Sequence, residues 1–224
     1  MTRARVAQQP PAPDLDLTGF PTARPTGDLV RAHSTAHGPW YFANDGGGRF
    51  DLQGDRGTCY AADTVRTAVR ERLGESCVAS KIVAFDDADA MTVSVIEVVP
   101  MYRAAAISAP GADDYPVTGE LANMSDYTVT QAWAQRFDED TDNRFDGIQY
   151  RSRFAIADAP ECWATFGPAG PADRPVAALA LMDGHAACAE AGLTVTPPPP
   201  MSPGVLTVIL PPGVKVIRKK SRNS

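Results

Sequence analysis

The sequence predicts an α+β fold, in which strands and helices both contribute to a domain of ordinary size. Residues 91–99, MTVSVIEVV, are rich in β-branched residues and are typical of a strand. Residues 64–73 and 126–137 instead carry apolar residues at helical spacing. The hydrophobic fraction of 44% and the charged fraction of 21% are those of a soluble globular protein, whose core can form without disulfides or metal.

The N-terminal part of the chain predicts a tail, a strand and a glycine turn. Residues 1–27 are rich in proline and polar residues, and we expect them to form a flexible lead-in. Residues 28–42 predict a short strand followed by a loop. Residues 46–48 are all glycine, which gives this turn unusual backbone freedom.

A strand and a helix are expected after the glycine turn. Residues 57–61 predict the strand, and residues 64–73 predict the helix. Asp63 is the expected N-cap of this helix, and Gly74 is expected to end it. The apolar face of the helix would consist of Val65, Ala68, Val69 and Leu73.

The middle of the chain predicts further strands and a second helix. Residues 80–85 and 91–99 are expected strands, and Pro100 ends the second of them. Residues 103–120 are rich in Ala, Gly, Asp and Pro and predict a loop. Residues 126–137 predict a helix that an acidic turn follows.

The last strands of the main domain are expected at residues 147–152 and 162–166, so we place this domain at residues 28–167. Residues 168–224 are expected to form a partly ordered C-terminal extension with a basic tail. Within it, residues 175–192 are rich in alanine and predict a helix. The apolar stretch VLTVILPPGVKVI further on could add a terminal strand or two.

Composition and charge exclude several classes of protein. The net charge of −6 argues against a general nucleic-acid binder, which usually has a basic face. The basic residues at the start of the chain precede no apolar stretch, so we expect no secretory signal. The longest apolar run, residues 176–182, is far shorter than the roughly 20 residues that cross a bilayer. We therefore expect a cytoplasmic protein without a membrane partner.

No metal site or disulfide is expected. The four cysteines, which are Cys59, Cys77, Cys162 and Cys188, are scattered, form no CxxC pair and predict reduced thiols. The acidic run DEDTDNRFDG has alternating carboxylates, but it lacks the central glycine and terminal glutamate of a calcium loop. This run predicts a solvated turn.

Residues 46–71, GGGRFDLQGDRGTCYAADTVRTAVRE, combine three chemical groups within one loop, strand and helix. The glycine turn brings Arg49, the strand brings Tyr60, and the helix brings Glu71. A cation, an aromatic ring and a carboxylate are the groups needed to hold a phosphorylated, positively charged nucleotide and to stabilise a carbocation made from it. The alternative for Glu71 is a solvated helix residue between Arg70 and Arg72.

The ordered set of these motifs resembles the RES domain family, named for its arginine, glutamate and serine. The stretch at residues 46–71 is followed by DGIQYRSRF and then by CWATF, in the family's order. The resemblance covers about residues 28–167. It implies a fold similar to that of the mono-ADP-ribosyltransferases, with mixed and antiparallel sheets and flanking helices.

The resemblance also implies a function. RES proteins are typically bacterial toxins of toxin–antitoxin pairs that consume NAD by hydrolysis or phosphorolysis of the nicotinamide–ribose bond. NAD is then the substrate and inorganic phosphate a possible co-substrate, with no prosthetic group. The usual partner is an antitoxin with a helix-turn-helix DNA-binding part. The long C-terminal extension departs from the family and puts the usual pairing with an antitoxin in doubt.

The resemblance assigns site residues by position. The early arginine of the family matches Arg31, the arginine of the glycine turn matches Arg49, and the late serine matches Ser152; either arginine could be the named one. The full set of expected site residues is Arg31, Gly48, Arg49, Tyr60, Glu71 and Ser152.

The chemistry of NAD gives each residue an expected role. Arg31 and Arg49 would hold the pyrophosphate or an incoming phosphate, because guanidinium groups donate paired hydrogen bonds. Tyr60 would stack on the nicotinamide. Glu71 would stabilise the ribose cation that develops when the glycosidic bond breaks. Ser152 would bond the nicotinamide amide or a phosphate, and the turn at Gly48 would let backbone approach the ligand.

Alternatives remain at this stage. His33 and His37 could help to bind phosphate, although a loop histidine is more often an exposed residue without a binding role. The same scaffold could transfer ADP-ribose onto a protein, or it could serve as a binding module without catalysis.

Overall fold

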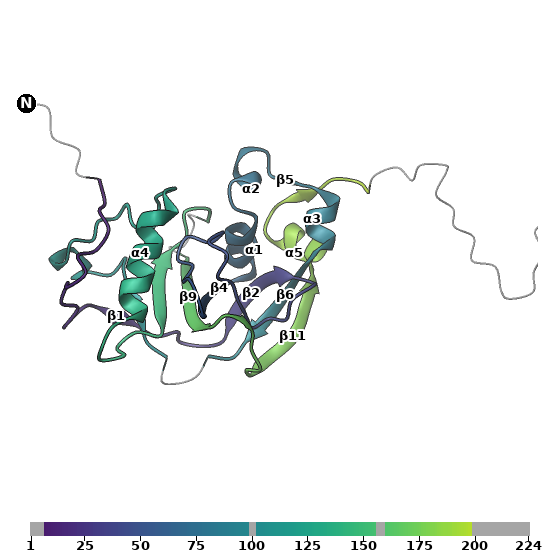
Figure 1. The fold of residues 1–224 in the computed structure, drawn as a ribbon. Coiled ribbons are helices and arrows are strands. Elements are labelled where there is room, and N and C mark those ends of the chain that lie inside the picture. Colours follow the sequence, from purple (N-terminus) through teal and green to yellow (C-terminus); the bar gives the residue numbers. More distant parts are fainter. Residues whose placement is uncertain (1–6, 99–101, 156–159, 199–224) are drawn as a thin grey trace, which may run out of the picture.

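The computed structural model describes residues 7–98, 102–155 and 160–198, and its centre is a sheet of eight strands in the order β1-β7-β8-β9-β4-β2-β6-β11 (Figure 1). Strands β7 and β8 pair in parallel, and the other neighbouring pairs of this sheet are antiparallel. In that order the strands are β1 (Thr22–Ala23), β7 (Ala104–Ala106), β8 (Gly147–Arg151), β9 (Glu161–Pro168), β4 (Arg56–Ala62), β2 (Leu29–Ser34), β6 (Met91–Ile96) and β11 (Val176–Asp183).

Smaller elements complete the fold. Strands β3 (Tyr41–Phe42) and β10 (Gly170–Pro171) pair antiparallel, and β5 (Ile82–Val83) and β12 (Thr194–Val195) pair in parallel. The helices are α1 (Val65–Leu73), α2 (Ser76–Ala79), α3 (Phe85–Asp89), α4 (Tyr127–Asp138) and α5 (Gly184–Glu190), with a 3₁₀ turn at Ala112–Asp114. The prediction of an α+β fold is therefore confirmed; the likeness to mono-ADP-ribosyltransferases stays a prediction.

The helices cover the sheet in two groups that leave a site between them. Helix α1 packs on β2 and α5, whereas α4 packs on β8 (Figure 1). The core beneath α4 is aromatic and includes Trp133, Phe137 and Phe50, each with no exposed surface. The core between α1 and α5 is aliphatic and includes Val69 and Cys188. Both helices that flank the site are thus held by buried apolar area.

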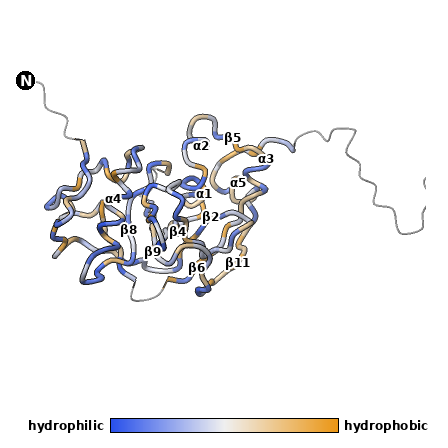
Figure 2. Tube along the Cα trace, viewed as in Figure 1, coloured by the Kyte–Doolittle hydropathy of each residue, from blue (hydrophilic) through white to orange (hydrophobic). Residues whose placement is uncertain are grey.

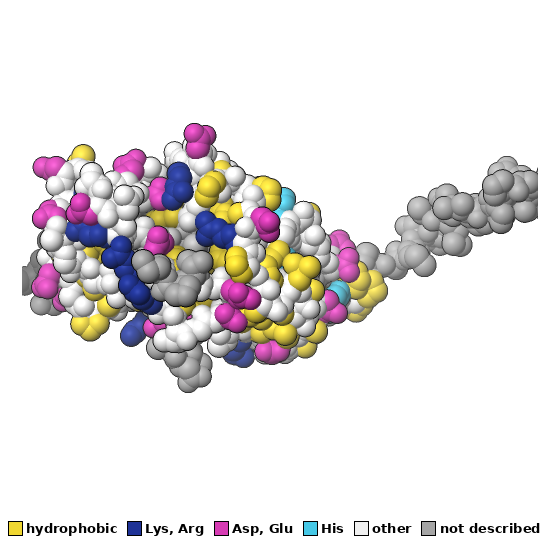
Figure 3. Space-filling view, turned by 90° about the horizontal axis from the view of Figure 1, so that it is seen from below, with side chains coloured by type: hydrophobic (Ala, Val, Ile, Leu, Met, Phe, Trp, Pro, Cys, Tyr) yellow, Lys and Arg dark blue, Asp and Glu magenta, His cyan; other side chains and the backbone are white. Residues whose placement is uncertain are grey.

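Strand β11 forms one edge of the sheet and leaves large apolar side chains exposed. Hydrophobic colour runs along this strand in Figure 2, and hydrophobic side chains gather on the lower face of the molecule in Figure 3. Leu179 and Leu181 of β11 are 67% and 45% exposed. Within the described ranges, no helix is long and apolar enough to span a membrane.

The structure corrects the expected boundaries at both ends of the chain. Residues 7–27 are not a flexible lead-in, because Leu17 and Phe20 are buried in the core and β1 pairs with β7. The helix expected at residues 175–192 is wrong in its first half, where β11 pairs with β6. Sheet pairing overrides the helix propensity of the alanines there. The apolar stretch at residues 205–217 and the basic tail lie outside the described residues.

The structure also differs from the expected local features at three places. Helix α1 is capped by Thr64, whose Oγ1 accepts a hydrogen bond from the Thr67 N–H at 3.2 Å, and not by Asp63. The Asp63 carboxylate instead accepts from the Trp163 indole N–H at 2.9 Å. The expected loop at residues 103–120 contains β7, and only Ile82–Val83 of the strand expected at residues 80–85 forms. Gly74 ends α1 as expected, with a φ of 59°.

Candidate active site

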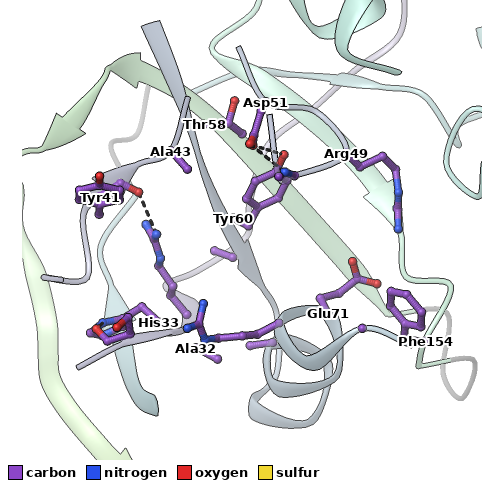
Figure 4. Close-up of a pocket in the computed structure, with 18 of the residues that line it drawn as sticks. Ala32, His33, Tyr41, Ala43, Arg49, Asp51, Thr58, Tyr60, Glu71 and Phe154 are labelled. Carbon is purple, nitrogen blue, oxygen red and sulfur yellow. Dashed lines mark hydrogen bonds between the residues drawn. The ribbon is translucent and has the colours of Figure 1, made fainter. Parts of the chain in front are cut away.

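A cavity of about 770 Å³ opens between β2, β4, α1 and the glycine turn (Figure 4). Its volume lies in the range of about 300–1,000 Å³ that is usual for small-molecule sites. The charged side chains that line it include Arg31, Arg49, Arg72, Arg153, Asp51 and Glu71. Five of the six expected site residues line this cavity, and the sixth, Ser152, lies directly behind Glu71.

Glu71 is fixed in the wall of the cavity by two hydroxyl groups from the end of β8. Ser152 Oγ donates to Glu71 Oε1 at 2.6 Å, and the Tyr150 hydroxyl donates to Oε2 at 3.3 Å. Burial, and then the negative charge of Glu71, hold the pKa of Tyr150 well above its usual range, so this phenol stays protonated and donates. Two donors to one carboxylate hold it in its present orientation.

Ser152 is itself held by backbone. Its Oγ accepts hydrogen bonds from the N–H groups of Phe154 and Ala155, both at 3.1 Å, while it donates to Glu71. The residue is buried and is absent from the cavity lining. Ser152 therefore contacts Glu71, whereas the sequence predicts contact with the nicotinamide amide or a phosphate.

Arg49 lies beside this carboxylate group. The residue is buried, its Nη1 donates to the Ala122 carbonyl at 2.7 Å, and its Cζ lies 5.4 Å from the centre of the Tyr150 ring. Its Nε is buried without a hydrogen-bond partner among the described residues. In Figure 4, Arg49, Glu71 and Phe154 share one end of the cavity. Arg49 thus presents a cation close to Glu71, with donor capacity to spare.

Gly48, Asp51 and Tyr60 form a compact network under the glycine turn. The Asp51 carboxylate accepts from the Gly48 N–H and from the Tyr60 hydroxyl, both at 2.8 Å. The Tyr60 hydroxyl in turn accepts from the Phe50 N–H at 2.8 Å. A Cβ on Gly48 would lie 2.3 Å from Asp51 Oδ1 and 2.5 Å from the Tyr60 hydroxyl. Gly48 is needed for this close approach, and the Tyr60 hydroxyl is fully engaged within the protein.

Burial sets the protonation of this network. It raises the pKa of Asp51, although the hydrogen bonds from Gly48 and Tyr60 oppose the rise. Burial, and then the charge of Asp51, hold the pKa of Tyr60 well above its usual range. Tyr60 therefore remains a neutral phenol that donates to Asp51.

Helix α4 holds the glycine turn from the other side. Gln131 Nε2 donates to the carbonyls of Gly46 at 3.0 Å and Gly48 at 2.9 Å. The neighbouring Thr130 Oγ1 donates to the Arg49 carbonyl. Carbonyls on both sides of the turn are thus bound to one helix, which fixes the backbone that carries Arg49.

Arg31 lies at the opposite end of the cavity, on β2. Its Nη2 donates to the Tyr41 carbonyl at 2.8 Å, and its Nη1 contacts the Cys59 sulfur. His33, two residues further along β2, lies within 2.8 Å of Ser94 Oγ through Nε2. Figure 4 places His33 and Tyr41 across the cavity from Arg49 and Phe154. Burial first, and then the charges of Arg31 and Arg72, lower the pKa of His33.

Several site residues were missed from the sequence. Asp51 and Tyr150 belong to motifs that predicted other site residues, and Gln131 lies on a helix 83 residues from Gly48, the expected site residue whose carbonyl it binds. The missed residues that shape the cavity are Asp51, Arg72, Gln131, Tyr150 and Arg153. In the described part of the chain, no three His, Cys, Asp or Glu side chains gather where they could hold a metal ion.

A family model of the RES domain matches residues 28–184, which is more than half of the chain. The chain belongs to the RES domain family. The match confirms the resemblance seen in the sequence, and it extends through β11 beyond the limit at residue 167 that we expected. The sheet shows no division at that point either.

Among solved structures, this RES domain is similar to a chain in the crystal structure of the M. tuberculosis MbcT–MbcA toxin–antitoxin complex. The sequences are 13% identical, the match covers 62% of this chain and 73% of that chain, and the TM-score is 0.48. No curated protein matches the chain.

Proposed function

We propose that this RES domain cleaves the nicotinamide–ribose bond of NAD. The observation that carries the proposal is the Glu71 carboxylate, held at the cavity wall by Ser152 and Tyr150 with Arg49 beside it. A fixed carboxylate in a partly enclosed site stabilises positive charge that develops on a sugar. Membership of the RES family supports the choice of NAD as the sugar donor.

The proposed reaction passes through a ribose cation. The bond between ribose C1′ and the nicotinamide nitrogen breaks, and its electron pair stays on the nicotinamide, which leaves as a neutral ring. Glu71 stabilises the oxocarbenium-like ribose, which is then captured by an oxygen of water or of inorganic phosphate. Water yields ADP-ribose and releases a proton, whereas phosphate yields ADP-ribose that carries the phosphate on the carbon from which nicotinamide left.

The other groups bind the substrate or position Glu71. Tyr60 offers a ring whose hydroxyl is tied to Asp51, which suits it to stack on an aromatic ring rather than to transfer a proton. Arg31 and Arg49 supply donors for anionic oxygens. In this proposal Ser152 acts through Glu71 and is a positioning residue.

At the level of the cell, we propose a cytoplasmic toxin of a toxin–antitoxin pair. Its partner would be an antitoxin with a helix-turn-helix DNA-binding part, which would close the cavity when bound. NAD loss would then follow release of the antitoxin.

The deciding experiment measures nicotinamide release from NAD by the purified protein, with and without inorganic phosphate. We expect release that Glu71→Gln abolishes. Absence of release under both conditions would reject the proposal. Label carried from NAD onto lysate proteins would favour ADP-ribosyl transfer, and a biological effect that survives Glu71→Gln would favour a binding module.

A further inference from the structure

Arg70, which precedes Glu71 on α1, joins three segments that are far apart in the chain. Its Nη2 and Nε donate to the Ala191 carbonyl at 3.0 and 3.3 Å, and its Nη1 donates to the Phe154 carbonyl at 3.4 Å. Ala191 and Phe154 lie 121 and 84 residues further along the chain. Within the described ranges, no carboxylate lies within salt-bridge distance of this guanidinium, so its described partners are both backbone carbonyls.

The Ala191 carbonyl anchors Arg70 to the core. Ala191 is the C-cap of α5 and is fully buried between α1 and α5. The last carbonyls of a helix have no partner within the helix, so a cation that donates to one of them is favourable. Two nitrogens of the planar guanidinium bind this carbonyl, which fixes the direction in which the third nitrogen reaches Phe154.

Phe154 belongs to the short segment that holds Ser152. The N–H groups of Phe154 and Ala155 both donate to Ser152 Oγ at 3.1 Å. That oxygen in turn donates to Glu71 Oε1 at 2.6 Å. Arg70 and Glu71, which are neighbours on α1, therefore bind this segment at two points.

These hydrogen bonds form a closed circuit around the Glu71 carboxylate. Ser152 binds the carboxylate, and the Phe154 N–H orients Ser152. Arg70 then ties the Phe154 carbonyl back to α1. Without Arg70 this carbonyl loses its bond to α1, and the N–H groups that orient Ser152 are free to shift. A misplacement of about 1 Å in a catalytic group can lower the reaction rate by about 100-fold.

We infer that Arg70 is a positioning residue for Glu71 and that it uses the C-terminal end of α5 as its support. The inference rests on the proposed function in taking Glu71 as the catalytic carboxylate. Arg70 does not line the cavity, so it acts through Ser152 and not on the substrate. It also gives the part of the chain after residue 167 a role in the active site, because α5 carries the carbonyl to which Arg70 is anchored.

Two substitutions of Arg70 and one matched control separate this role from a simple loss of charge. Arg70→Gln removes the charge and the guanidinium. Arg70→Lys keeps the charge but offers one nitrogen where the guanidinium uses three. Arg66→Gln removes the same charge about one turn earlier on α1, at an exposed position that does not line the cavity. Thermal unfolding followed by circular dichroism checks that each variant is folded.

Steady-state nicotinamide release from NAD is the first test. We expect kcat to fall about tenfold in Arg70→Gln and in Arg70→Lys, with KM within about twofold of wild type, because the cavity lining is unchanged. Arg66→Gln should match wild type within about twofold. Wild-type kcat in either folded Arg70 variant overturns the inference.

A double variant shows whether Arg70 acts through Ser152. In the Ser152→Ala background, Arg70→Gln should lower kcat by no more than about twofold, because the bond that Arg70 supports is already absent. A general loss of order around α1 would instead lower kcat as much in this background as in wild type. Effects of the two substitutions that multiply therefore overturn the inference.

Amide hydrogen exchange tests the same role without a substrate. The N–H groups of Phe154 and Ala155 are bonded to Ser152 Oγ, and their exchange, measured by NMR, should be about tenfold faster in Arg70→Gln than in wild type and Arg66→Gln. Unchanged exchange overturns the inference.

The two measurements distinguish this inference from the proposed function. If exchange depends on Arg70 but the wild type releases no nicotinamide, the positioning of Ser152 by Arg70 stands and the proposed reaction fails. If the wild type releases nicotinamide and Arg70→Gln keeps its kcat, the reaction stands and the positioning role is overturned.

Discussion

Ser152 Oγ donates a 2.6 Å hydrogen bond to the Glu71 carboxylate, across a separation of 81 residues in the chain. The serine follows β8 and the glutamate lies on α1, so the bond joins the sheet to the helix at the wall of the cavity. Because Ser152 also accepts from two backbone N–H groups, its donor direction is set before any ligand arrives. The carboxylate is thereby preorganised for charge that develops later on a substrate.

The first prediction concerns the negative charge of Glu71. Glu71→Gln keeps the size of the side chain and an acceptor for Ser152 but removes the negative charge. We expect kcat for nicotinamide release to fall by at least about 100-fold, since electrostatic stabilisation is usually the largest catalytic contribution. Thermal unfolding followed by circular dichroism should show that the variant is folded. A kcat within a few-fold of wild type would contradict the proposed role.

The two donors to Glu71 should differ in importance. Ser152→Ala removes the 2.6 Å bond and leaves the N–H groups of Phe154 and Ala155 without their acceptor, whereas Tyr150→Phe removes only a 3.3 Å bond. We expect Ser152→Ala to lower kcat more than Tyr150→Phe and to reduce the free energy of unfolding by about 1–3 kcal/mol. Steady-state kinetics and urea denaturation measure both effects. The reverse order in kcat would count against Ser152 as the main positioning residue.

Gly48 should not tolerate a side chain. A Cβ there would lie 2.3 Å from Asp51 Oδ1 and 2.8 Å from Tyr60 Cε2, so Gly48→Ala must displace the network that holds Tyr60. We expect a loss of about 1–3 kcal/mol in the free energy of unfolding, together with lower NAD affinity. Gly27→Ala is the control, because nothing lies within 4 Å of its Cβ position. Equal stability of the two variants would show that the network adapts.

Gln131 should control the position of Arg49 from outside the cavity. Gln131→Leu removes both hydrogen bonds to the glycine turn while keeping side-chain volume. We expect KM for NAD to rise several-fold with a smaller change in kcat, because Glu71 is not touched. Gln135→Leu, one turn along α4, loses only an exposed bond to Glu139 and should behave as wild type. A change confined to stability would reduce Gln131 to a structural role.

His33 should make stability depend on pH. Its pKa is lowered by burial and by the charges of Arg31 and Arg72, so the unfolded chain binds its proton more readily than the folded chain does. The free energy of unfolding should therefore fall as pH drops below about 6.5, with a slope of up to about 1.4 kcal/mol per pH unit. The other groups that contact His33 are Ser94 Oγ and the carbonyls of Ser34 and His37.

Urea denaturation between about pH 5 and pH 7.5 measures this slope. His33→Asn should remove most of it, since none of those contacting groups titrates in this window. If the variant keeps the wild-type slope, other residues carry the proton uptake.

Local chemistry made the site partly predictable. Arg49, Tyr60 and Glu71 fall within one loop, strand and helix, and Gly74 ends that helix with a positive φ of 59°. Ser152 was found only because a family resemblance joined it to the first stretch. Arg72 and Gln131 could not be distinguished from ordinary surface residues, because their roles depend on which elements of the fold face them.

The fold was predictable where periodicity was strong and not where tertiary pairing decided the outcome. The helix at Tyr127–Asp138 and the strand at Met91–Ile96 lie where the pattern predicted them. The alanines of β11 favour a helix in isolation, but pairing with β6 holds them extended. The burial of Leu17 in a proline-rich segment likewise depends on the distant strand β7 and helix α4.

The pairing of β11 with β6 sets the shortest length of chain that can be produced as a stable protein. A version cut at residue 167 would turn β6 into an open edge and would remove Cys188 and Leu193 from the packing around α1. Helix α1 carries Glu71, so such a shortened protein would lose order at the carboxylate as well as solubility. Fusion partners and affinity handles therefore belong after residue 195, beyond β12.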